Sequence, residues 1–190
     1  MIILYVMALF GFLFYSYALV DPNLTFINHP VWNQFRNIVL PLGYFQREQS
    51  WYVYLALILL FFLFNLFFIK KYKEMDVLKI AFIIGGILLF AYPFLSHDLF
   101  NYLFDAKIVT FYHQNPYFLK PLDFPNDQWL RFMHWTHRTY PYGPVFLGLS
   151  LIPSFLSLGK FILSFLFFKT TIVVFYLLTV FCLQKMNKKW

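Results

Sequence analysis

Four apolar segments of the chain are long enough to cross a lipid bilayer, and they limit the folds that this sequence can adopt. They comprise residues 2–20, 52–69, 77–95 and 161–183. A helix needs about 20 consecutive apolar residues to span the hydrocarbon core. Only 12% of the 190 residues are charged, whereas soluble domains average about a quarter. The sequence therefore predicts a single all-α membrane domain with about four transmembrane helices.

Clustered lysines predict the orientation of these segments. Lys70, Lys71 and Lys73 directly follow the second apolar segment, and short loops rich in lysine stay on the cytoplasmic side of a membrane. The turn between the second and third spans is then cytoplasmic, and so is the N-terminus. Residues 21–51 and 96–160 become loops on the outer face.

A fifth apolar segment, residues 145–158, is shorter than a span. It has about 14 residues and carries Pro153, and this length is typical of a re-entrant or interfacial helix. If it crossed the bilayer, the lysines at 185, 188 and 189 would lie outside, against the charge rule. We therefore expect a half-helix at the outer face, followed by a last span that runs inward.

The formal net charge of +7 raises the question of a polyanionic partner. The lysines stand next to apolar segments and do not form a basic domain outside the membrane. Anionic lipid headgroups are therefore the simpler partner. We expect contacts with membrane lipids and no binding of nucleic acid.

Residues 96–144 form a polar island between apolar segments. The island holds four of the five histidines and four of the eight acidic residues. Ionisable groups are costly to keep at a membrane face, so their presence indicates a functional site.

Asp98 is the first candidate for catalysis. It lies about three residues beyond the third apolar segment, so its carboxylate is expected at the outer surface, where it can take a proton from a hydroxyl as a general base. A helix-capping role for Ser96 or Asp98 explains the same residues. The residues that follow fit a short interfacial helix that presents Asp98, Asn101 and Asp105 on one side.

Two patterns in the island could take part in binding a divalent cation. Asp98 and Asp105 lie two helical turns apart, on one helix face and about 10 Å from each other. A cation between them would need further ligands from the loop. His134 and His137 would share a helix face at their spacing, but no nearby Glu or Cys completes a zinc site. The metal requirement is left open, and no other cofactor is implied.

The island also carries groups that suit a phosphorylated sugar. A phosphate needs cationic donors, and Arg138 is preferred because it lies close to the turn at 140–144. Two rigid turns, Asn-Pro-Tyr at 115–117 and Tyr-Gly-Pro at 142–144, each present an aromatic ring. Such rings suit the apolar faces of a sugar. The cations of the loop are Lys107, Lys120, Arg131 and Arg138.

The order and spacing of these motifs are more specific than each motif alone. Ser-x-Asp-x-x-x-Tyr at 96–102 follows a span, Asn-Pro-Tyr at 115–117 and Trp129 come next, and Tyr-Gly-Pro at 142–144 opens the half-helix. This arrangement resembles the first large outer loop of C-type (GT-C) integral membrane glycosyltransferases. It resembles in particular the bacterial polyprenyl-phosphate-mannose-dependent mannosyltransferases, over about residues 92–153.

The resemblance implies a glycosyltransferase of the bacterial plasma membrane with its active loop on the outer face. The enzyme would transfer a sugar, mannose by this resemblance, with inversion from a polyprenyl-phosphate donor to a hydroxyl of a glycan or lipid acceptor. The loop aspartate of the family, its presumed general base, matches Asp98. Arg138 or Lys107 would meet the charge of the leaving polyprenyl phosphate. The half-helix would lie against the lipid donor.

We expect the substrate to be bound by polar and aromatic side chains around Asp98. These are His97, Asn101, Tyr102, Asp105, Lys107, Asn115, Tyr117, Arg138 and Tyr142.

The chain departs from the family pattern in two ways. Asp105-Ala106-Lys107 stands where relatives often carry a small residue or glycine. Such enzymes also have eight or more spans, whereas this chain has about four. The chain holds the N-terminal portion of such an enzyme, the half that carries the catalytic loop. Three interpretations stay open: a fragment, one part of a split enzyme, or a minimal relative that needs a partner, for which a second membrane subunit with the missing spans is the candidate.

Two other classes of function remain open. A lipid-phosphate hydrolase or phosphotransferase could use His97 or His113 as nucleophile, but the loop lacks the cationic cradle that this chemistry needs. A non-catalytic scaffold or transporter subunit of an envelope-glycan assembly is the other alternative. Transporters place polar groups inside their spans, where this chain has almost none beyond Asn65.

Overall fold

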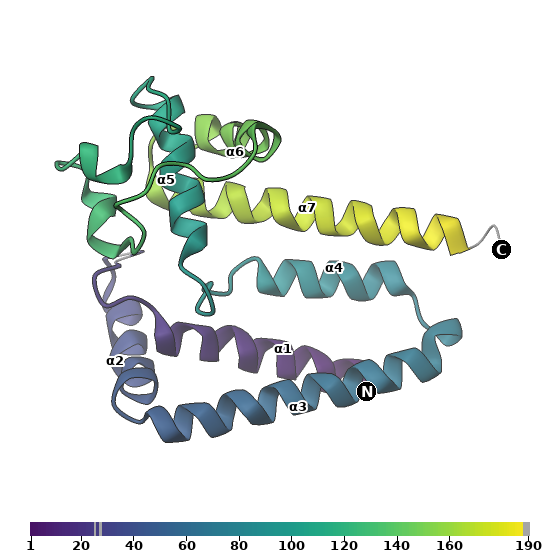
Figure 1. The fold of residues 1–190 in the computed structure, drawn as a ribbon. Helices are drawn as coiled ribbons and strands as arrows, with labels where there is room; N and C mark the ends of the chain where they lie inside the picture. Colours follow the sequence, from purple (N-terminus) through teal and green to yellow (C-terminus); the bar gives the residue numbers. More distant parts are fainter. Residues whose placement is uncertain (25, 27, 188–190) are drawn as a thin grey trace. The chain divides into compact units, whose positions relative to one another are not determined.

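The protein is helical throughout the part of the chain that the structure describes. The computed structural model describes residues 1–24, 26 and 28–187, with only the backbone of Asn187. In these residues seven α-helices and four short 3-10 turns follow one another, and there is no strand (Figure 1). The predicted all-α class is therefore confirmed for the described residues.

The chain divides into two compact units. Unit 1 comprises Met1–Val20, Ile27–Tyr92 and Val173–Trp190, and unit 2 comprises Asp21–Phe26 and Pro93–Ile172. The polar island at 96–144 thus folds within unit 2.

Three helical segments are long and apolar enough to cross a membrane. The first is α1 (Ile2–Ser16), which continues through the 3-10 turn η1 (Tyr17–Leu19). The second is α3 (Arg47–Lys71), which continues through η2 (Tyr72–Glu74). The third is α7 (Phe161–Asn187). By length and composition, these segments match three of the four predicted spans.

The remaining predicted span, residues 77–95, is helical over only part of its length. Helix α4 (Val77–Leu88) has 12 residues, which extend over about 18 Å and fall short of the roughly 30 Å hydrocarbon core. Gly85 and Gly86 weaken the helix near its end, and Pro93 disfavours helical backbone just before it. The described residues therefore contain three helices of spanning length instead of the four expected.

Helix α1 is the centre of unit 1 and lies between α3 and α4 (Figure 1). Tyr5 contacts three phenylalanine rings of α3 edge-to-face, at centroid distances of 6.0, 5.1 and 4.9 Å. Further along α1, the Tyr15 hydroxyl donates a hydrogen bond to the Ser50 carbonyl at 3.0 Å. Ser16 Oγ accepts the backbone N–H of Tyr92 at 2.9 Å. Aromatic packing and buried hydroxyls thus hold α1 in place.

Helix α2 (Pro30–Tyr44) packs closely against η1 in the same unit. The Tyr44 hydroxyl donates to the carbonyl of Val20 at 3.1 Å. A Cβ atom added at Gly43 would lie 1.9 Å from the carbonyl oxygen of Ala18. Only glycine therefore allows this approach of helix to backbone.

Helix α5 (Asp98–Thr110) is the central helix of unit 2 and packs against α6 (Pro144–Leu156), the half-helix of the sequence prediction (Figure 1). Nine of its 13 residues are buried. An amphipathic interfacial helix was expected at this position, but α5 is covered on its polar side too. The cause is the segment 111–143, which contains η3 (Pro121–Asp123) and η4 (Gln128–Phe132) and contacts that side of α5.

Replacing Gly43 with alanine should destabilise unit 1. The added methyl group meets backbone rather than a movable side chain, so we expect a loss of about 3 kcal/mol, at the upper end of overpacking costs. Thermal unfolding in detergent, followed by circular dichroism, measures this loss. Gly86→Ala is the matched control, because this helical glycine has no atom within 4 Å of the added Cβ. An equal loss in both variants would contradict the packing argument.

Candidate active site

Asp98 is the first residue of α5 and is positioned by the turn before it. Ser96 Oγ accepts the backbone N–H of Asp98 at 3.2 Å. A carboxylate is favourable at a helix N-terminus, because the first N–H groups of a helix give it a partial positive charge. The turn from Ser96 to Asp98 starts the helix, and the Asp98 side chain is still 37% exposed. A capping role and an accessible carboxylate are therefore compatible.

Arg138 is the cation that contacts Asp98. Its Nη2 atom lies 3.7 Å from Oδ1 of Asp98, and its guanidinium carbon lies 5.2 Å from the centre of the Trp135 ring. About a third of each charged side chain remains exposed. The fold thus brings the predicted base and the preferred phosphate ligand into contact at an accessible position.

Three predicted site tyrosines meet in the same unit. The Tyr102 hydroxyl donates to the Tyr142 hydroxyl at 3.3 Å, and the Tyr117 hydroxyl donates to the Tyr142 carbonyl at 3.1 Å. Burial is the main cause that raises the pKa of Tyr102 well above its usual value, and the charge of Asp98 adds to it. The tyrosines therefore form a wall of rings and hydroxyls close to the carboxylate.

Asn115 shapes the turn that carries Tyr117. Its Oδ1 accepts the backbone N–H of Tyr117 at 2.9 Å. The carbonyl of Pro116 accepts the N–H of Tyr140 at 2.8 Å. The two turns that the sequence singled out are thus joined by one backbone hydrogen bond, and Asn115 positions a ring.

A layer of buried polar groups follows on α5. Asn101 is 3% exposed, and its Nδ2 donates to the carbonyl of Trp135 at 3.0 Å. Its Oδ1 has no hydrogen-bond partner among the described residues, and the buried hydroxyl of Tyr140 has none either. Such groups are uncommon inside proteins and call for a ligand or water. The sequence did not indicate Tyr140 as a site residue, because its position depends on the bond to Pro116.

Burial changes the proton affinity of Asp105. Its side chain belongs to the same layer, and burial raises the pKa of its carboxyl group to about 7, while the Arg138 charge partly opposes the shift. The two acids of α5 therefore differ, because Asp98 is accessible and Asp105 is enclosed and partly protonated near neutral pH.

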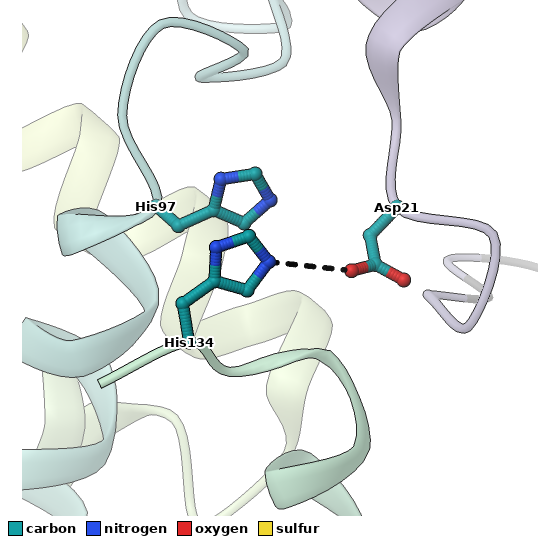
Figure 2. Close-up of side chains that lie close together, drawn as sticks. All are labelled: Asp21, His97 and His134. Atoms are coloured by element: carbon teal, nitrogen blue, oxygen red, sulfur yellow. Dashed lines mark ion pairs between the residues drawn. The ribbon is translucent and has the colours of Figure 1, made fainter. Parts of the chain in front are cut away.

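His97 and His134 lie against each other, together with Asp21 (Figure 2). The two rings stack with their centroids 3.8 Å apart and their planes at 12°. His134 Nε2 lies 3.9 Å from Asp21 Oδ2. Burial lowers the pKa of His97, and the second imidazole lowers it further. His134 and His137 do not share a helix face, because residues 133–138 are not helical.

The side chains that lie close enough together to bind a metal ion are not the predicted pair Asp98 and Asp105. Among the described residues, Asp21, His97 and His134 form the one group of three side chains that could hold an ion. The loop brings no such set to Asp98 and Asp105, since Asp98 contacts Arg138 and Asp105 is enclosed.

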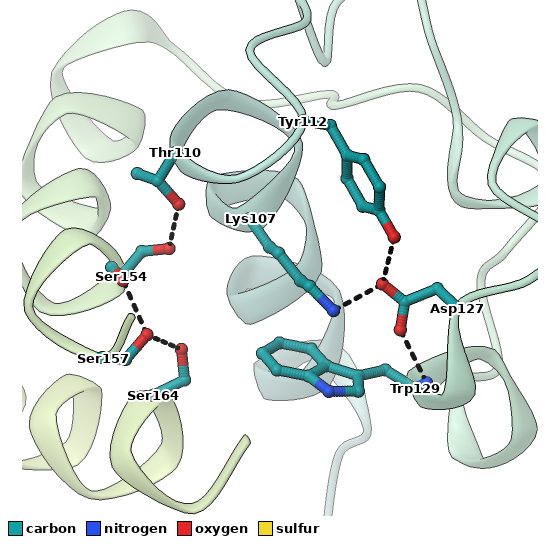
Figure 3. Close-up of polar contacts among 8 residues, drawn as sticks. All are labelled: Lys107, Thr110, Tyr112, Asp127, Trp129, Ser154, Ser157 and Ser164. Atoms are coloured by element: carbon teal, nitrogen blue, oxygen red, sulfur yellow. Dashed lines mark hydrogen bonds and ion pairs between the residues drawn. The ribbon is translucent and has the colours of Figure 1, made fainter. Parts of the chain in front are cut away.

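Lys107 forms a buried ion pair with Asp127 (Figure 3). Its Nζ lies 2.5 Å from Asp127 Oδ2 and 3.9 Å from the centre of the Trp129 ring. The Tyr112 hydroxyl donates to the same carboxylate oxygen at 2.7 Å, and Asp127 Oδ1 accepts the backbone N–H of Trp129 at 2.9 Å. Lys107, predicted as an alternative phosphate ligand, is thus engaged in holding the loop against α5.

A row of hydroxyls joins α5, α6 and α7 within unit 2 (Figure 3). Thr110 Oγ1 lies 2.8 Å from Ser154 Oγ. Ser157 Oγ donates to the Ser154 carbonyl at 2.6 Å, and Ser164 Oγ donates to Ser157 Oγ at 2.9 Å. These small side chains satisfy one another where the three helices approach closely.

Removing Asp127 should destabilise the loop strongly. Asp127→Ala leaves the Lys107 ammonium buried without its partner, which costs about 3–5 kcal/mol. Chemical denaturation, read from tryptophan fluorescence, measures the loss. Glu74→Ala is the control, because it breaks the exposed ion pair with Lys71, and such pairs contribute about 0–1 kcal/mol. A similar small effect of both substitutions would show that the buried pair does not stabilise the loop.

The pKa of Asp105 predicts a pH-dependent effect of Asp105→Asn. The native carboxyl group has a pKa of about 7 and the unfolded one a pKa of about 4, so the native state binds the proton more tightly. The free energy that protonated Asp105 contributes to the stability of the folded protein is thus fully present below pH ~4, and it is lost as the pH rises to ~7. The amide imitates the protonated acid. It should stabilise the protein at pH 8, by at most about 4 kcal/mol, and be neutral at pH 4. Melting temperatures measured across this pH range test the prediction.

The chain matches one family model over nearly its whole length. Residues 3–190 match the MptA/B family model described as "Alpha-(1->6)-mannopyranosyltransferase, N-terminal domain". No curated protein and no solved structure matches the chain significantly. The match confirms the resemblance inferred from the order of the loop motifs. The chain therefore belongs to the MptA/B family of alpha-(1→6)-mannopyranosyltransferases, as an N-terminal domain of that family of mannosyltransferase enzymes.

Proposed function

We propose that this domain supplies the general base and the phosphate-binding cation for inverting transfer of mannose from a polyprenyl-phosphate donor to a hydroxyl acceptor. The observation that supports this best is the contact between Asp98 and Arg138, 3.7 Å apart at the start of α5. The reaction needs a group that takes a proton and a cation that meets a leaving phosphate in one place.

Accessibility favours Asp98 over Asp105 as the base. A general base must come within hydrogen-bond distance of the acceptor hydroxyl. Asp98 is 37% exposed, whereas Asp105 is 3% exposed. Asp105 is better suited to hydrogen-bonding a bound sugar, together with Asn101 and Tyr140, whose buried oxygens have no partner among the described residues.

The proposed step is a single displacement at C1 of mannose. The acceptor oxygen bonds to C1 while its proton passes to the carboxylate of Asp98. The bond from C1 to the phosphate oxygen breaks on the opposite face, and polyprenyl phosphate leaves with the electron pair. The Arg138 guanidinium stabilises its negative charge. Because one displacement inverts C1, the α-(1→6) linkage in the family's description requires a β-linked donor.

The tyrosine wall is the proposed contact surface for the sugar ring. The rings of Tyr102 and Tyr142 pack edge-to-face with centroids 5.3 Å apart, and Tyr117 bonds to the same turn. Aromatic faces suit the apolar faces of a hexose. In this proposal His97, Asn115 and Lys107 act mainly by holding their neighbours in place.

The proposed setting is the outer face of a bacterial plasma membrane. The lysines at 70, 71 and 73 favour a cytoplasmic turn after α3. In this proposal residues 77–95 cross the membrane as α4 together with the residues that follow it, which puts unit 2 outside. Helix α6 exposes apolar side chains such as Val145 and Phe155, and these suit an interface that bears the lipid donor. We further propose that additional spans, on this protein or on a partner, complete the sites for donor and for glycan or lipid acceptor.

Asp98→Asn should remove most of the transferase activity. In membranes that contain the enzyme and a radiolabelled polyprenyl-phosphate-mannose donor, we expect a loss of about 10²–10⁴-fold, the usual contribution of a general base. Donor binding, measured by photo-crosslinking, should persist, because the base acts on the acceptor.

Asp123→Asn is the matched control for this experiment. Asp123 is an exposed acid of the same loop, and its replacement should leave transfer unchanged. Full activity of Asp98→Asn together with loss in Asp105→Asn would move the base to Asp105. Unchanged transfer in both variants would favour the non-catalytic scaffold.

A further inference from the structure

We propose that Asp21, His97 and His134 bind a divalent transition-metal ion of the zinc type. This site uses none of the residues assigned to the base, the phosphate or the sugar ring, and the inference stands whether or not the proposed reaction is correct. It rests on the arrangement of three side chains from three separate segments of unit 2 (Figure 2).

The three ligand atoms already lie close together. One atom from each of Asp21, His97 and His134 can be chosen so that all three lie within 4.8 Å of one another. Zinc holds nitrogen and oxygen ligands at about 2.0–2.2 Å, which places neighbouring ligands about 3.3 Å apart in a tetrahedron. The nitrogen lone pairs of parallel stacked rings do not converge on one point, so binding an ion requires the two imidazoles to rotate out of the stack until one nitrogen of each points at the ion.

The donor set indicates the class of metal. Two imidazole nitrogens and one carboxylate oxygen suit Zn²⁺, Co²⁺ or Ni²⁺, whereas Mg²⁺ and Ca²⁺ prefer sites made of oxygen atoms. Three protein ligands also leave a fourth position open, as in catalytic zinc sites. The side chain of His134 is 52% exposed, so water or an anionic oxygen can reach that position.

The surroundings orient each ligand. Asp21 Oδ1 accepts the backbone N–H of Asn23 at 2.8 Å, and Oδ2 lies on the side of His134. Hydrogen bonds of this kind fix metal-binding carboxylates. The backbone next to His134 is held by the bond from Asn101 to the Trp135 carbonyl. His97 directly precedes α5. The ion would therefore tie Asp21 to the start of the helix that carries Asp98.

Metal binding to the purified full chain tests this inference. The protein, carrying no histidine tag and stripped with a chelator, is dialysed against Zn²⁺ or Co²⁺, and bound metal is counted by mass spectrometry. We expect one ion per chain, with Mg²⁺ in excess unable to displace it. His134→Ala and Asp21→Asn should each weaken binding at least about tenfold, while His137→Ala should not.

Chemical modification of the wild-type protein keeps the test independent of how well the variants fold. Diethyl pyrocarbonate modifies accessible imidazoles, and peptide mass spectrometry locates the modified residues. Zn²⁺ should protect His97 and His134 but leave His137 reactive. Equal labelling with and without Zn²⁺, or an equal loss of binding in His137→Ala and His134→Ala, would overturn the proposal.

Discussion

The arrangement of residues 111–143 depends above all on one buried ion pair. Residues 111–143 contain only short 3-10 turns, so regular secondary structure does not place them. Lys107 comes from α5 and Asp127 from the loop, and each charge is costly to bury alone. Both are compensated only when the loop lies against the helix. Together with the hydrogen bond from Asn101 to the Trp135 carbonyl, this ion pair brings Arg138 to the side of α5 on which Asp98 lies.

The sequence predicts the elements whose cause is local. Apolar length indicates the long helices α1, α3 and α7, and the order of the loop motifs indicates the family. Helix α4 ends early, because its glycines and the following proline outweigh the apolar composition. The partners of side chains far apart in sequence were not predictable. Lys107 meets Asp127 20 residues later, and His134 stacks on His97, because the loop closes and not because of any local pattern.

Spacing alone also gives an incomplete account of the two acids on α5. Asp98 and Asp105 share a helix face, as their separation of two turns indicates. Their environment differs, because Asp105 is enclosed in the middle of the helix whereas Asp98, its first residue, stays partly exposed. Depth of burial, which no periodicity reports, separates a carboxylate that a substrate can reach from one that holds its proton near neutral pH.

The hydrogen bond from the Tyr140 N–H to the Pro116 carbonyl closes residues 116–140 into a loop that contains Asp127, one partner of the buried pair. Such closure fixes the number of residues between the two turns more strictly than their identity. During divergence, an insertion between Pro116 and Tyr140 would pull one turn away from the other. Substitutions at exposed positions such as Phe118, which is 80% exposed, would leave the closure intact. The closure therefore constrains the length of this loop more than it constrains the exposed side chains.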